Sequence, residues 1–345
     1  MFAGIDFYSD TITRPTRAMR QAMAEAEVGD EQKREDPTTL RLEERMATLL
    51  GKTGAMFFPS ATLANEIAIR LQCSPGDELI AAEDCHLYFA EAGGPAIHSA
   101  VICKAIPTAS GIFSGDDVRR QYRWPKGPHY PVSRLVSVEN TTNMGGGVAW
   151  SKAQLQDVVS AAQELRLKLH MDGSRLFNAA VATALSPREI ADGFDTVTVC
   201  FSKGLGCPTG AILAFDNVQW DTVRRLKQLF GGAMRQSGIL AAACLYALDH
   251  HVERLAEDHA NARRLAELLS TIGALEVESR APSSNMVFFR WRSTACGDRE
   301  FLDRCVAQGV RFSHVGANRF RAVTHMDVSA ADVEQAANIV REICG

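Results

Sequence analysis

The stretch TVTVCFSKGLGCPTGAIL, residues 196–213, decides the fold. It begins with a run of β-formers, continues through Ser202 and Lys203 into a glycine-rich turn, and ends in a second apolar run. We predict two buried strands, over 195–201 and 210–215, with the lysine at the mouth between them. Because an unpaired ammonium group beside a protein core is costly, Lys203 needs either a partner or a chemical role.

Strand and helix patterns alternate on the N-terminal side of this stretch. The predicted strands lie within 55–59, 74–82, 134–140 and 168–172, and the predicted helices within 15–27, 38–52, 62–73 and 151–167. Continuous apolar strands that alternate with helices are typical of an α/β fold whose mainly parallel sheet is covered on both faces. In such sheets the functional residues collect at the carboxyl ends of the strands.

The pattern changes after residue 250. Residues 233–270 favour helix almost throughout, and short strand patterns then accompany helical ones. The strand patterns cover 285–291, 309–314 and 319–325, and the helical ones lie near 298–308 and 329–343. We therefore predict a large domain with an N-terminal arm over 1–250 and a small C-terminal α+β domain over 251–345, joined by the long helix.

Composition excludes several classes of protein. The 345 residues are 46% hydrophobic and 23% charged with a net charge of −4, which does not favour binding to nucleic acid or anionic membranes. The nine cysteines form no CxxC pair, so we expect reduced thiols in the cytoplasm and no metal site. The N-terminus lacks a secretory signal pattern, and no uncharged apolar run reaches the roughly 20 residues of a membrane span.

Two strand ends carry residues that suit a planar, charged ligand. Asp172 follows the strand KLHM, where it can pair with a protonated ring nitrogen. The alternatives are a buried aspartate that caps the following turn or one that pairs with Arg175. Lys203 follows the strand TVTVCF, where it can form an imine or simply reach solvent. The glycines and Pro208 after Lys203 favour the first alternative, because they build a tight turn whose backbone can approach a ligand.

A third strand end offers an anion site. Ser60, Ala61 and Thr62 open a predicted helix, whose free N–H groups can hold a phosphate; a plain helix cap is the alternative. A lysine, an aspartate and a phosphate nest on one α/β chain together fit pyridoxal 5′-phosphate, which needs one of each.

At this point the sequence resembles the low-specificity L-threonine aldolase family of fold-type I pyridoxal-phosphate enzymes. The matching stretches are YSDTITRPT (8–16), VGD and EDPT (28–30 and 35–38), HLYFAEAGG (86–94), ENTTN (139–143), MDGSRLFNAAVA (171–182), CFSKGLGCPTGAIL (200–213), GGAMRQSGILAAACLYAL (231–248) and VTHMDVS (323–329). The resemblance implies a large, mainly parallel seven-stranded sheet domain and a small C-terminal α+β domain. It also implies a homotetramer with active sites at subunit interfaces.

The resemblance implies a role for each matched residue. Lys203 would form the Schiff base with the cofactor, Asp172 would hold the pyridine nitrogen, and His86 would stack on the ring; these three are the expected catalytic residues. Arg175 would lie near the phenolic oxygen and the substrate carboxylate.

The same resemblance places the phosphate and the substrate. Ser60, Ala61 and Thr62 would hold the phosphate, with Arg235 reaching in from a neighbouring subunit. Ser9 and Arg321 would clamp the carboxylate of a β-hydroxy-α-amino acid such as L-threonine, L-allo-threonine or phenylserine. Cleavage between Cα and Cβ would then give glycine and an aldehyde.

One departure from the family pattern affects the chemistry. Where many members read E-N-T-H-N, this chain reads ENTTN, so Thr142 replaces a histidine near the substrate hydroxyl. A threonine is a poor base, so either His86, a water or the cofactor phosphate takes the proton, or the substrate preference differs. Thr142 also leaves open a different reaction, β-elimination of a hydroxy amino acid. A non-catalytic binding protein is a further alternative. It is disfavoured because the chain retains Lys203, Asp172, Arg175 and Arg321.

Two other departures are local. Gln32, Lys33 and Arg34 replace a usual V-Y-G, which gives either a solvated loop or an altered pocket. Ala61 replaces a common glycine, which the start of a helix tolerates.

Overall fold

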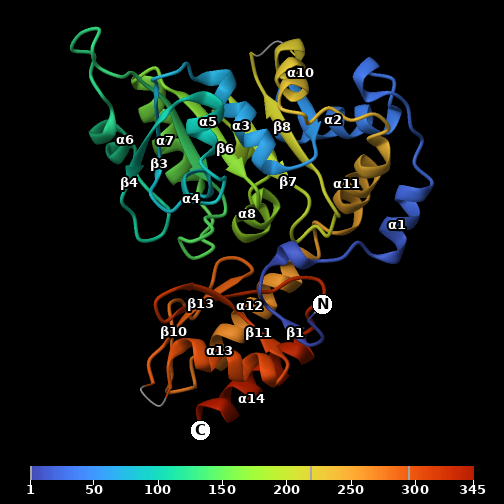
Figure 1. Ribbon diagram of the computed structural model, residues 1–345, viewed down its shortest axis with the longest axis vertical. Coiled ribbons are helices and arrows are strands. Elements are labelled where there is room, and N and C mark those ends of the chain that lie inside the picture. The colour runs from blue at the N-terminus through green and yellow to red at the C-terminus, as the bar shows by residue number, and fades with distance from the viewer. Residues whose placement is uncertain (1, 218–219, 294–295) are drawn as a thin grey trace.

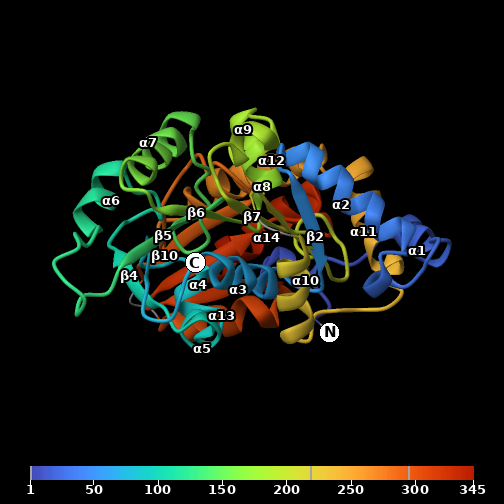
Figure 2. The ribbon, with the colours of Figure 1, turned by 90° about the horizontal axis from the view of Figure 1, so that it is seen from above.

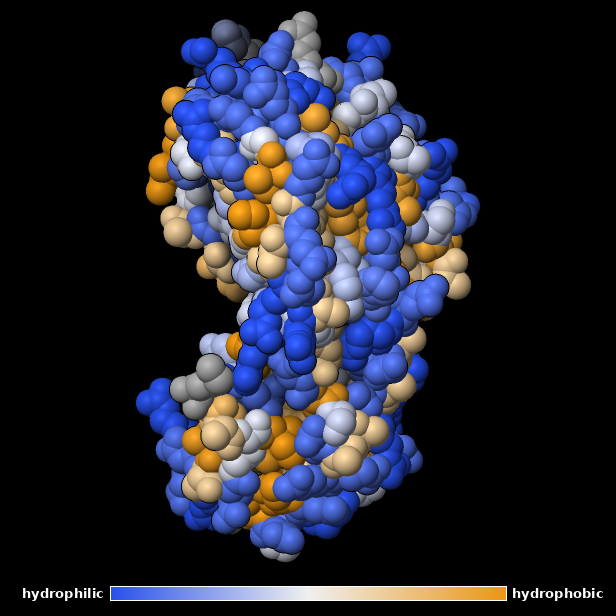
Figure 3. Space-filling model, turned by 90° about the vertical axis from the view of Figure 1, so that its right-hand side faces the viewer, coloured by the Kyte–Doolittle hydropathy of each residue, from blue (hydrophilic) through white to orange (hydrophobic). Residues whose placement is uncertain are grey.

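The computed structural model describes residues 2–217, 220–293 and 296–345. It consists of a larger lobe and a smaller lobe, and both termini lie at the smaller one (Figure 1). Seen from the side, the molecule narrows between the two lobes (Figure 3).

A seven-stranded sheet forms the centre of the larger lobe. Its strands are β2 (Gly54–Phe58), β3 (Glu78–Ala82), β4 (Ile102–Ile106), β5 (Ser133–Glu139), β6 (Lys168–Gly173), β7 (Thr196–Cys200) and β8 (Ala211–Phe215). Their order in space is β2-β8-β7-β6-β5-β3-β4, and β8 runs in the opposite direction to the other six strands. The turn between β7 and β8 is too short for a crossover helix, so these two strands pair antiparallel. The predicted seven-stranded, mainly parallel sheet is confirmed.

Helices cover both faces of this sheet, as the view along it shows (Figure 2). The helices before residue 251 are α1 (Arg17–Ala24), α2 (Pro37–Leu50), α3 (Ala61–Gln72), α4 (His86–Phe89), α5 (Gly94–Ser99), α6 (Gly115–Gln121), α7 (Lys152–Glu164), α8 (Leu176–Thr183), α9 (Pro187–Ala191), α10 (Trp220–Leu229) and α11 (Gly238–His250), with 3-10 turns η1 (Asp10–Ile12) and η2 (Glu31–Lys33). Of these, α1 packs on α11 and not on the sheet, and η1 lies on the N-terminal arm. Every residue of β3, β7 and β8 is buried. Burial on both faces explains why these strands read as continuous apolar runs.

The smaller lobe has its own sheet and core. Its antiparallel sheet has the order β12-β13-β10-β9, and α12 to α14 accompany it. The elements are α12 (Leu255–Leu269), β9 (Leu275–Val277), β10 (Met286–Trp291), α13 (Asp298–Ala307), β11 (Val310–Arg311), β12 (Ser313–Gly316), β13 (Arg319–Val323) and α14 (Ala330–Cys344). Phe289, Phe301 and Phe320 lie in a hydrophobic cluster separate from the core of the larger lobe.

The N-terminal arm packs on the smaller lobe. Strand β1 (Ile5–Asp6) pairs in parallel with β11. Phe7 is fully buried in the smaller lobe's cluster, where its ring stacks on Phe312 at 5.6 Å between centroids. The arm therefore packs on the smaller lobe. The division of the chain into domains at residue 250 remains a prediction.

The prediction of one long helix over 233–270 is wrong. Helix α11 ends at His250 and α12 begins at Leu255. The chain turns between them, and Nδ1 of the buried His251 donates to the Leu205 carbonyl at 2.7 Å. The expected strand over 309–314 is likewise two short strands, β11 and β12. The break at His251 ties α11 to the turn that carries the lysine.

Candidate active site

The predicted site residues meet at one edge of the large sheet. Asp172 of β6 pairs with Glu139 of β5 and with Thr198 of β7. Lys203 follows the end of β7, and Ser60 follows the end of β2. Since β2 and β7 are both antiparallel to β8, they run in the same direction and end at the same edge. The lysine, the aspartate and the helix start therefore lie at one side of the sheet, as expected for residues that follow parallel strands.

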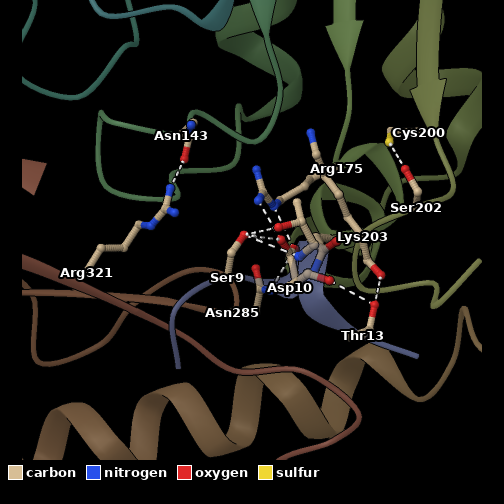
Figure 4. Close-up of polar contacts among 12 residues, drawn as sticks. Ser9, Asp10, Thr13, Asn143, Arg175, Cys200, Ser202, Lys203, Asn285 and Arg321 are labelled. Carbon is tan, nitrogen blue, oxygen red and sulfur yellow. Dashed lines mark hydrogen bonds and ion pairs between the residues drawn. The ribbon is translucent and has the colours of Figure 1, made fainter. Parts of the chain in front are cut away.

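The turn after β7 fixes the backbone of Lys203 and leaves its amine without a hydrogen bond. The N–H of Gly206, a residue with a φ of +73°, donates to the Lys203 carbonyl at 2.8 Å, and the Thr13 hydroxyl donates to the same oxygen at 2.7 Å. Figure 4 shows the side chain extending away from this anchor. Within residues 2–217, 220–293 and 296–345, no group hydrogen-bonds Nζ. The charge of Lys203 acts on the buried carboxylates of Asp10 and Asp172.

Asp172 is a buried carboxylate with two donors. Its Oδ1 accepts from the Ser174 N–H at 3.0 Å, and its Oδ2 accepts from Nδ2 of Asn65 at 3.1 Å. Burial alone would raise the pKa of Asp172, but the charges of Lys203 and His86 and the hydrogen bond from Ser174 hold it below its usual value. The group is therefore a carboxylate at neutral pH, as an ion pair with a protonated ring nitrogen requires.

His86 begins α4 and is paired with a buried acid. Its Nδ1 lies 2.8 Å from Oε1 of Glu91. Burial lowers the pKa of His86, but the hydrogen bond to Glu91 and the charges of Asp172 and Glu91 outweigh burial, and the net shift is upward. The His–Glu pair leaves Nε2 as the nitrogen available for other contacts.

Arg175 is held by a carboxylate that sequence reasoning did not single out. Its Nε donates to Oδ2 of Asp10 at 2.8 Å and its Nη2 donates to Oδ1 at 2.7 Å, with both residues buried (Figure 4). Asn285 Nδ2 also donates to Oδ2, at 3.3 Å. Burial opposes ionisation of Asp10, but Arg175 holds its pKa well below the usual range. The alternative pairing of Arg175 with Asp172 is therefore wrong.

Only part of the Arg321 guanidinium group has hydrogen-bond partners. Its Nη1 donates to Oδ1 of Asn143 at 2.5 Å and its Nη2 to the Tyr8 carbonyl at 3.5 Å. Its Nε is buried without a partner among the described residues. Burial and the nearby charge of Arg175 lower the pKa of Arg321 to about 10. Two neighbouring guanidinium groups, one with a free buried N–H, make a site that an anion would satisfy.

Ser9 lies in the same region and caps η1. Its hydroxyl accepts from the Thr11 N–H at 3.2 Å, and the side chain is buried. Capping η1 fixes the backbone of Asp10, the next residue, and through it Arg175. Figure 4 shows Ser9 on the arm beside these two groups.

The predicted phosphate turn is a regular, exposed helix start. The hydroxyl of Ser60 accepts from the Leu63 N–H at 3.2 Å and so caps α3. The N–H groups of Ala61 and Thr62 have no intrahelical acceptor, because they lie in the first turn. These free donors at the positive end of the helix dipole suit an anion.

Arg235 is not brought to this turn by its own chain. Its side chain is exposed, and Nη1 pairs with Oδ2 of Asp30 at 3.0 Å. Within the described residues it hydrogen-bonds no other predicted site residue. Its contribution from a neighbouring subunit remains a prediction.

Thr142 makes hydrogen bonds within its own loop. Its Oγ1 accepts from the Val148 N–H at 3.0 Å, its N–H donates to the Val148 carbonyl at 3.0 Å, and the residue is buried. These contacts favour a structural role. The neighbouring Glu139 accepts from the Asn143 N–H at 2.9 Å, and burial together with the charge of Asp172 raises its pKa to about 7.

The altered loop at 32–34 lies elsewhere. Arg34 stacks on Trp220, with its guanidinium carbon 4.0 Å from the ring centroid. Gln32 and Arg34 line a cavity of about 460 Å³ between η2, α2 and α10. Among the described residues that line this cavity there is no predicted cofactor or substrate residue. The loop is therefore a pocket wall, but the pocket is not at Lys203.

Sequence reasoning missed several polar residues of the site, namely Asp10, Asn65, Glu91, Asn143 and Asn285. Asp10 lies in the matched stretch YSDTITRPT directly after Ser9, so the signal was present. His86, Glu91 and Asp172 place ligand atoms within 4.8 Å of one another, as a metal site could. Hydrogen bonds through Asn65 already connect these groups, and the expected absence of a metal remains a prediction.

Comparisons with known proteins found relatives in sequence and in fold. The model of the beta-eliminating lyase family matches residues 6–292. The low specificity L-threonine aldolase of Escherichia coli K12 is 38% identical over 96% of this chain and 97% of its own. The threonine aldolase of Leishmania major superposes with a TM-score of 0.85 at 19% identity, covering 99% of this chain and 100% of that one.

A serine palmitoyltransferase from S. paucimobilis, solved with a bound PLP–myriocin aldimine, superposes with a TM-score of 0.77 at 16% identity, covering 99% of this chain and 87% of that one. At these identities the two structures show the shared fold. Among the helices of the described residues, none is long and apolar enough to cross a membrane.

Proposed function

Because this chain belongs to the beta-eliminating lyase family, as a relative of the low-specificity L-threonine aldolases, we propose that it is a pyridoxal-phosphate-dependent carbon–carbon lyase. It splits a β-hydroxy-α-amino acid, such as L-threonine, L-allo-threonine or phenylserine, into glycine and an aldehyde. The observation that carries this proposal is the buried guanidinium group of Arg175 beside the partly buried one of Arg321, in the same site as the amine of Lys203, which has no hydrogen bond among the described residues.

The residues present fit pyridoxal phosphate. Lys203 would hold its aldehyde carbon, Asp172 its ring nitrogen and the Ser60–Thr62 turn its phosphate, while His86 would lie on the ring. The cofactor needs an amine, a carboxylate and N–H groups for its phosphate. Nζ of Lys203, the ionised buried carboxylate of Asp172 and the first N–H groups of α3 supply them. When bound, the cofactor supplies an electron sink for the pair left on Cα when Cα–Cβ breaks.

The arginines orient the substrate. Among the described residues, Nε of Arg321 is buried without a hydrogen-bond partner, and Nη1 of Arg175 makes no hydrogen bond, since Asp10 binds only Nε and Nη2. A carboxylate between the two forks gains charge-assisted hydrogen bonds and relieves their mutual repulsion. Fixing the carboxylate fixes the direction of the Cα–Cβ bond, which is the positional part of the catalysis.

His86 takes the proton of the β-hydroxyl group. Cleavage requires that this proton leaves, and the Thr142 hydroxyl, which accepts from the Val148 N–H, is a poor base at neutral pH. Nδ1–H of His86 donates to Glu91, so Nε2 is the basic nitrogen. The carboxylate of Glu91 then stabilises the imidazolium that forms.

The protein functions as a cytoplasmic homotetramer with active sites at subunit interfaces. All nine cysteines are free, as the reducing cytoplasm favours. Near Arg235, Val28, Leu229 and Ile239 are exposed apolar side chains, as at a subunit contact. Mixing inactive Lys203→Ala and Arg235→Ala proteins should restore activity in hybrid oligomers, since one site then carries neither change; no recovery would contradict the shared site.

Product analysis with L-threo-phenylserine tests the reaction. Purified protein loaded with pyridoxal phosphate should give benzaldehyde and glycine in equal amounts, and Lys203→Ala should give neither. Phenylpyruvate with ammonia would instead establish β-elimination and overturn the proposed cleavage. A protein that binds no pyridoxal phosphate would overturn the enzyme assignment itself.

A further inference from the structure

A buried hydrogen-bonded network lies behind the carboxylate of Asp172. At its centre is Asn65 of α3, which is 1% exposed. Its Nδ2 lies 3.1 Å from Oδ2 of Asp172 and 2.9 Å from Oε1 of Glu91. Because a carboxylate accepts, the atom that faces both acids is the amide NH₂ group, which donates one hydrogen to each.

His170 fixes the orientation of this amide. Its Nε2 lies 3.2 Å from Oδ1 of Asn65, which can only accept, so Nε2 carries the hydrogen. Its Nδ1 accepts from the Thr196 hydroxyl at 2.8 Å, and that oxygen in turn accepts from Nε2 of Gln72 at 2.8 Å. Complete burial lowers the pKa of His170 to about 4, so the ring is neutral, as this chain of bonds requires. Every donor along the chain has an acceptor.

We propose that Asn65, oriented by His170, is a positioning residue that holds the carboxylates of Asp172 and Glu91 in place together. This inference rests on the proposed function. Through Asp172 it sets the contact to the cofactor's ring nitrogen, and through Glu91 it sets the orientation of His86. One amide thereby couples the group that binds the cofactor to the group that takes the proton.

The electrostatics of the cluster explain why an amide is needed. The ligand atoms of His86, Glu91 and Asp172 lie within 4.8 Å of one another, so the two carboxylates repel unless donors lie between them. Glu66 beside them adds no charge, because burial and the charge of Glu91 raise its pKa to about 9. An aspartate in place of Asn65 would keep the shape but replace the bridging donor by a third acid.

The test compares two isosteric substitutions. Asn65→Asp removes both donated hydrogen bonds without creating a cavity. Asn178→Asp is the matched control, because Asn178 is also buried, at 4% exposed, and also bonds a histidine, Nε2 of His259 at 3.2 Å, but lies outside this network. Three quantities are measured for each protein: the dissociation constant of pyridoxal phosphate, the visible absorption band of the lysine-bound cofactor, and kcat and KM.

In Asn65→Asp we expect the dissociation constant of pyridoxal phosphate to rise about 10- to 100-fold, as on loss of a hydrogen bond to a charged group. The absorption band should shift and kcat should fall, while KM stays within about threefold, because the arginines are unchanged. Asn178→Asp should leave all of these within about twofold of wild type. An Asn65→Asp protein with wild-type cofactor affinity, band and kcat overturns the inference.

A second pair of variants keeps the test decisive if Asn65→Asp does not fold. His170→Phe removes the donor to Asn65, and His170→Gln restores an N–H at that position. We expect weakened cofactor binding in the first and recovery in the second; equal behaviour of the two overturns the inference. A wild-type protein without the cofactor band overturns the proposed function and this inference with it, whereas a wild-type band unchanged by these variants overturns the inference alone.

Discussion

Replacing Asp10 by asparagine should destabilise the protein strongly, although the two side chains have the same shape. Asp10 is fully buried and accepts two hydrogen bonds from Arg175 and one from Asn285. The substitution removes the negative charge and leaves the guanidinium of Arg175 buried near the positive charges of Lys203 and Arg321. Breaking one side of a buried ion pair costs about 3–5 kcal/mol.

Thermal unfolding followed by calorimetry or dye fluorescence measures this loss. At about 2 °C per kcal/mol for a chain of this size, the midpoint should fall by about 6–10 °C at pH 7. The difference should depend on pH with a defined sign. Since the pKa of Asp10 in the folded protein lies below the ordinary 3.8, its stabilisation is complete above that value and is lost as the pH falls below it. Wild type and variant should therefore converge in acid.

Asp258→Asn is the control. Asp258 is also buried and accepts from Arg254 at 2.8 and 3.1 Å, but Arg254 reaches solvent. Burial, partly offset by Arg254, raises the pKa of Asp258 to about 6, so its ion pair is weaker and its loss should cost less. An Asp10→Asn midpoint within about 2 °C of wild type at pH 7, or a difference that does not shrink in acid, would refute the reasoning.

Three further predictions concern the site. Asp172→Ala should still bind pyridoxal phosphate, though more weakly, but lose most turnover, and near-normal turnover would remove its assigned role. Thr142→Val should lose the hydrogen bond to Val148 and about 1 kcal/mol of stability but keep kcat within a few-fold; a loss of kcat with unchanged stability would restore Thr142 as a participant. Since the pKa of His86 is raised and the base must be neutral, kcat/KM should fall as the pH drops through a value above 6.5. Glu91→Gln removes the main cause of that rise, so its acid limb should move to lower pH, and an unmoved limb would exclude His86 as the base.

Local sequence signals predicted most of the larger lobe. Strands buried on both faces have continuous apolar runs, and the expected strands over 195–201 and 210–215 match β7 and β8 within a residue or so at each end. Strand β4 went unpredicted because it is an edge strand, most of whose residues are exposed, and Lys104 interrupts its apolar residues. Strand β9 has only three residues, too few for a pattern.

The sequence predicted the position of those site residues that directly follow a strand. It did not predict the hydrogen-bond partners that are distant in sequence. Lys203, Asp172 and the Ser60 turn follow strands, so their position could be read locally. The pairing of Arg175 with Asp10 spans 165 residues, and the contact of Asn65 with Asp172 spans 107. No periodicity encodes such contacts, because they depend on which strands the folded sheet places together.

The pairing of β1 with β11 has a consequence for the order in which the protein is made. Asp6 and Arg311 are 305 positions apart, yet their pairing docks the arm that carries Ser9 and Asp10. The large sheet can form while synthesis continues, since all its strands precede residue 216. The arm must wait until residues near 311 have left the ribosome. A nascent chain can therefore assemble the proposed cofactor side of the site before the arm closes the proposed carboxylate side, so the part of the site that would hold the substrate carboxylate is the last to form.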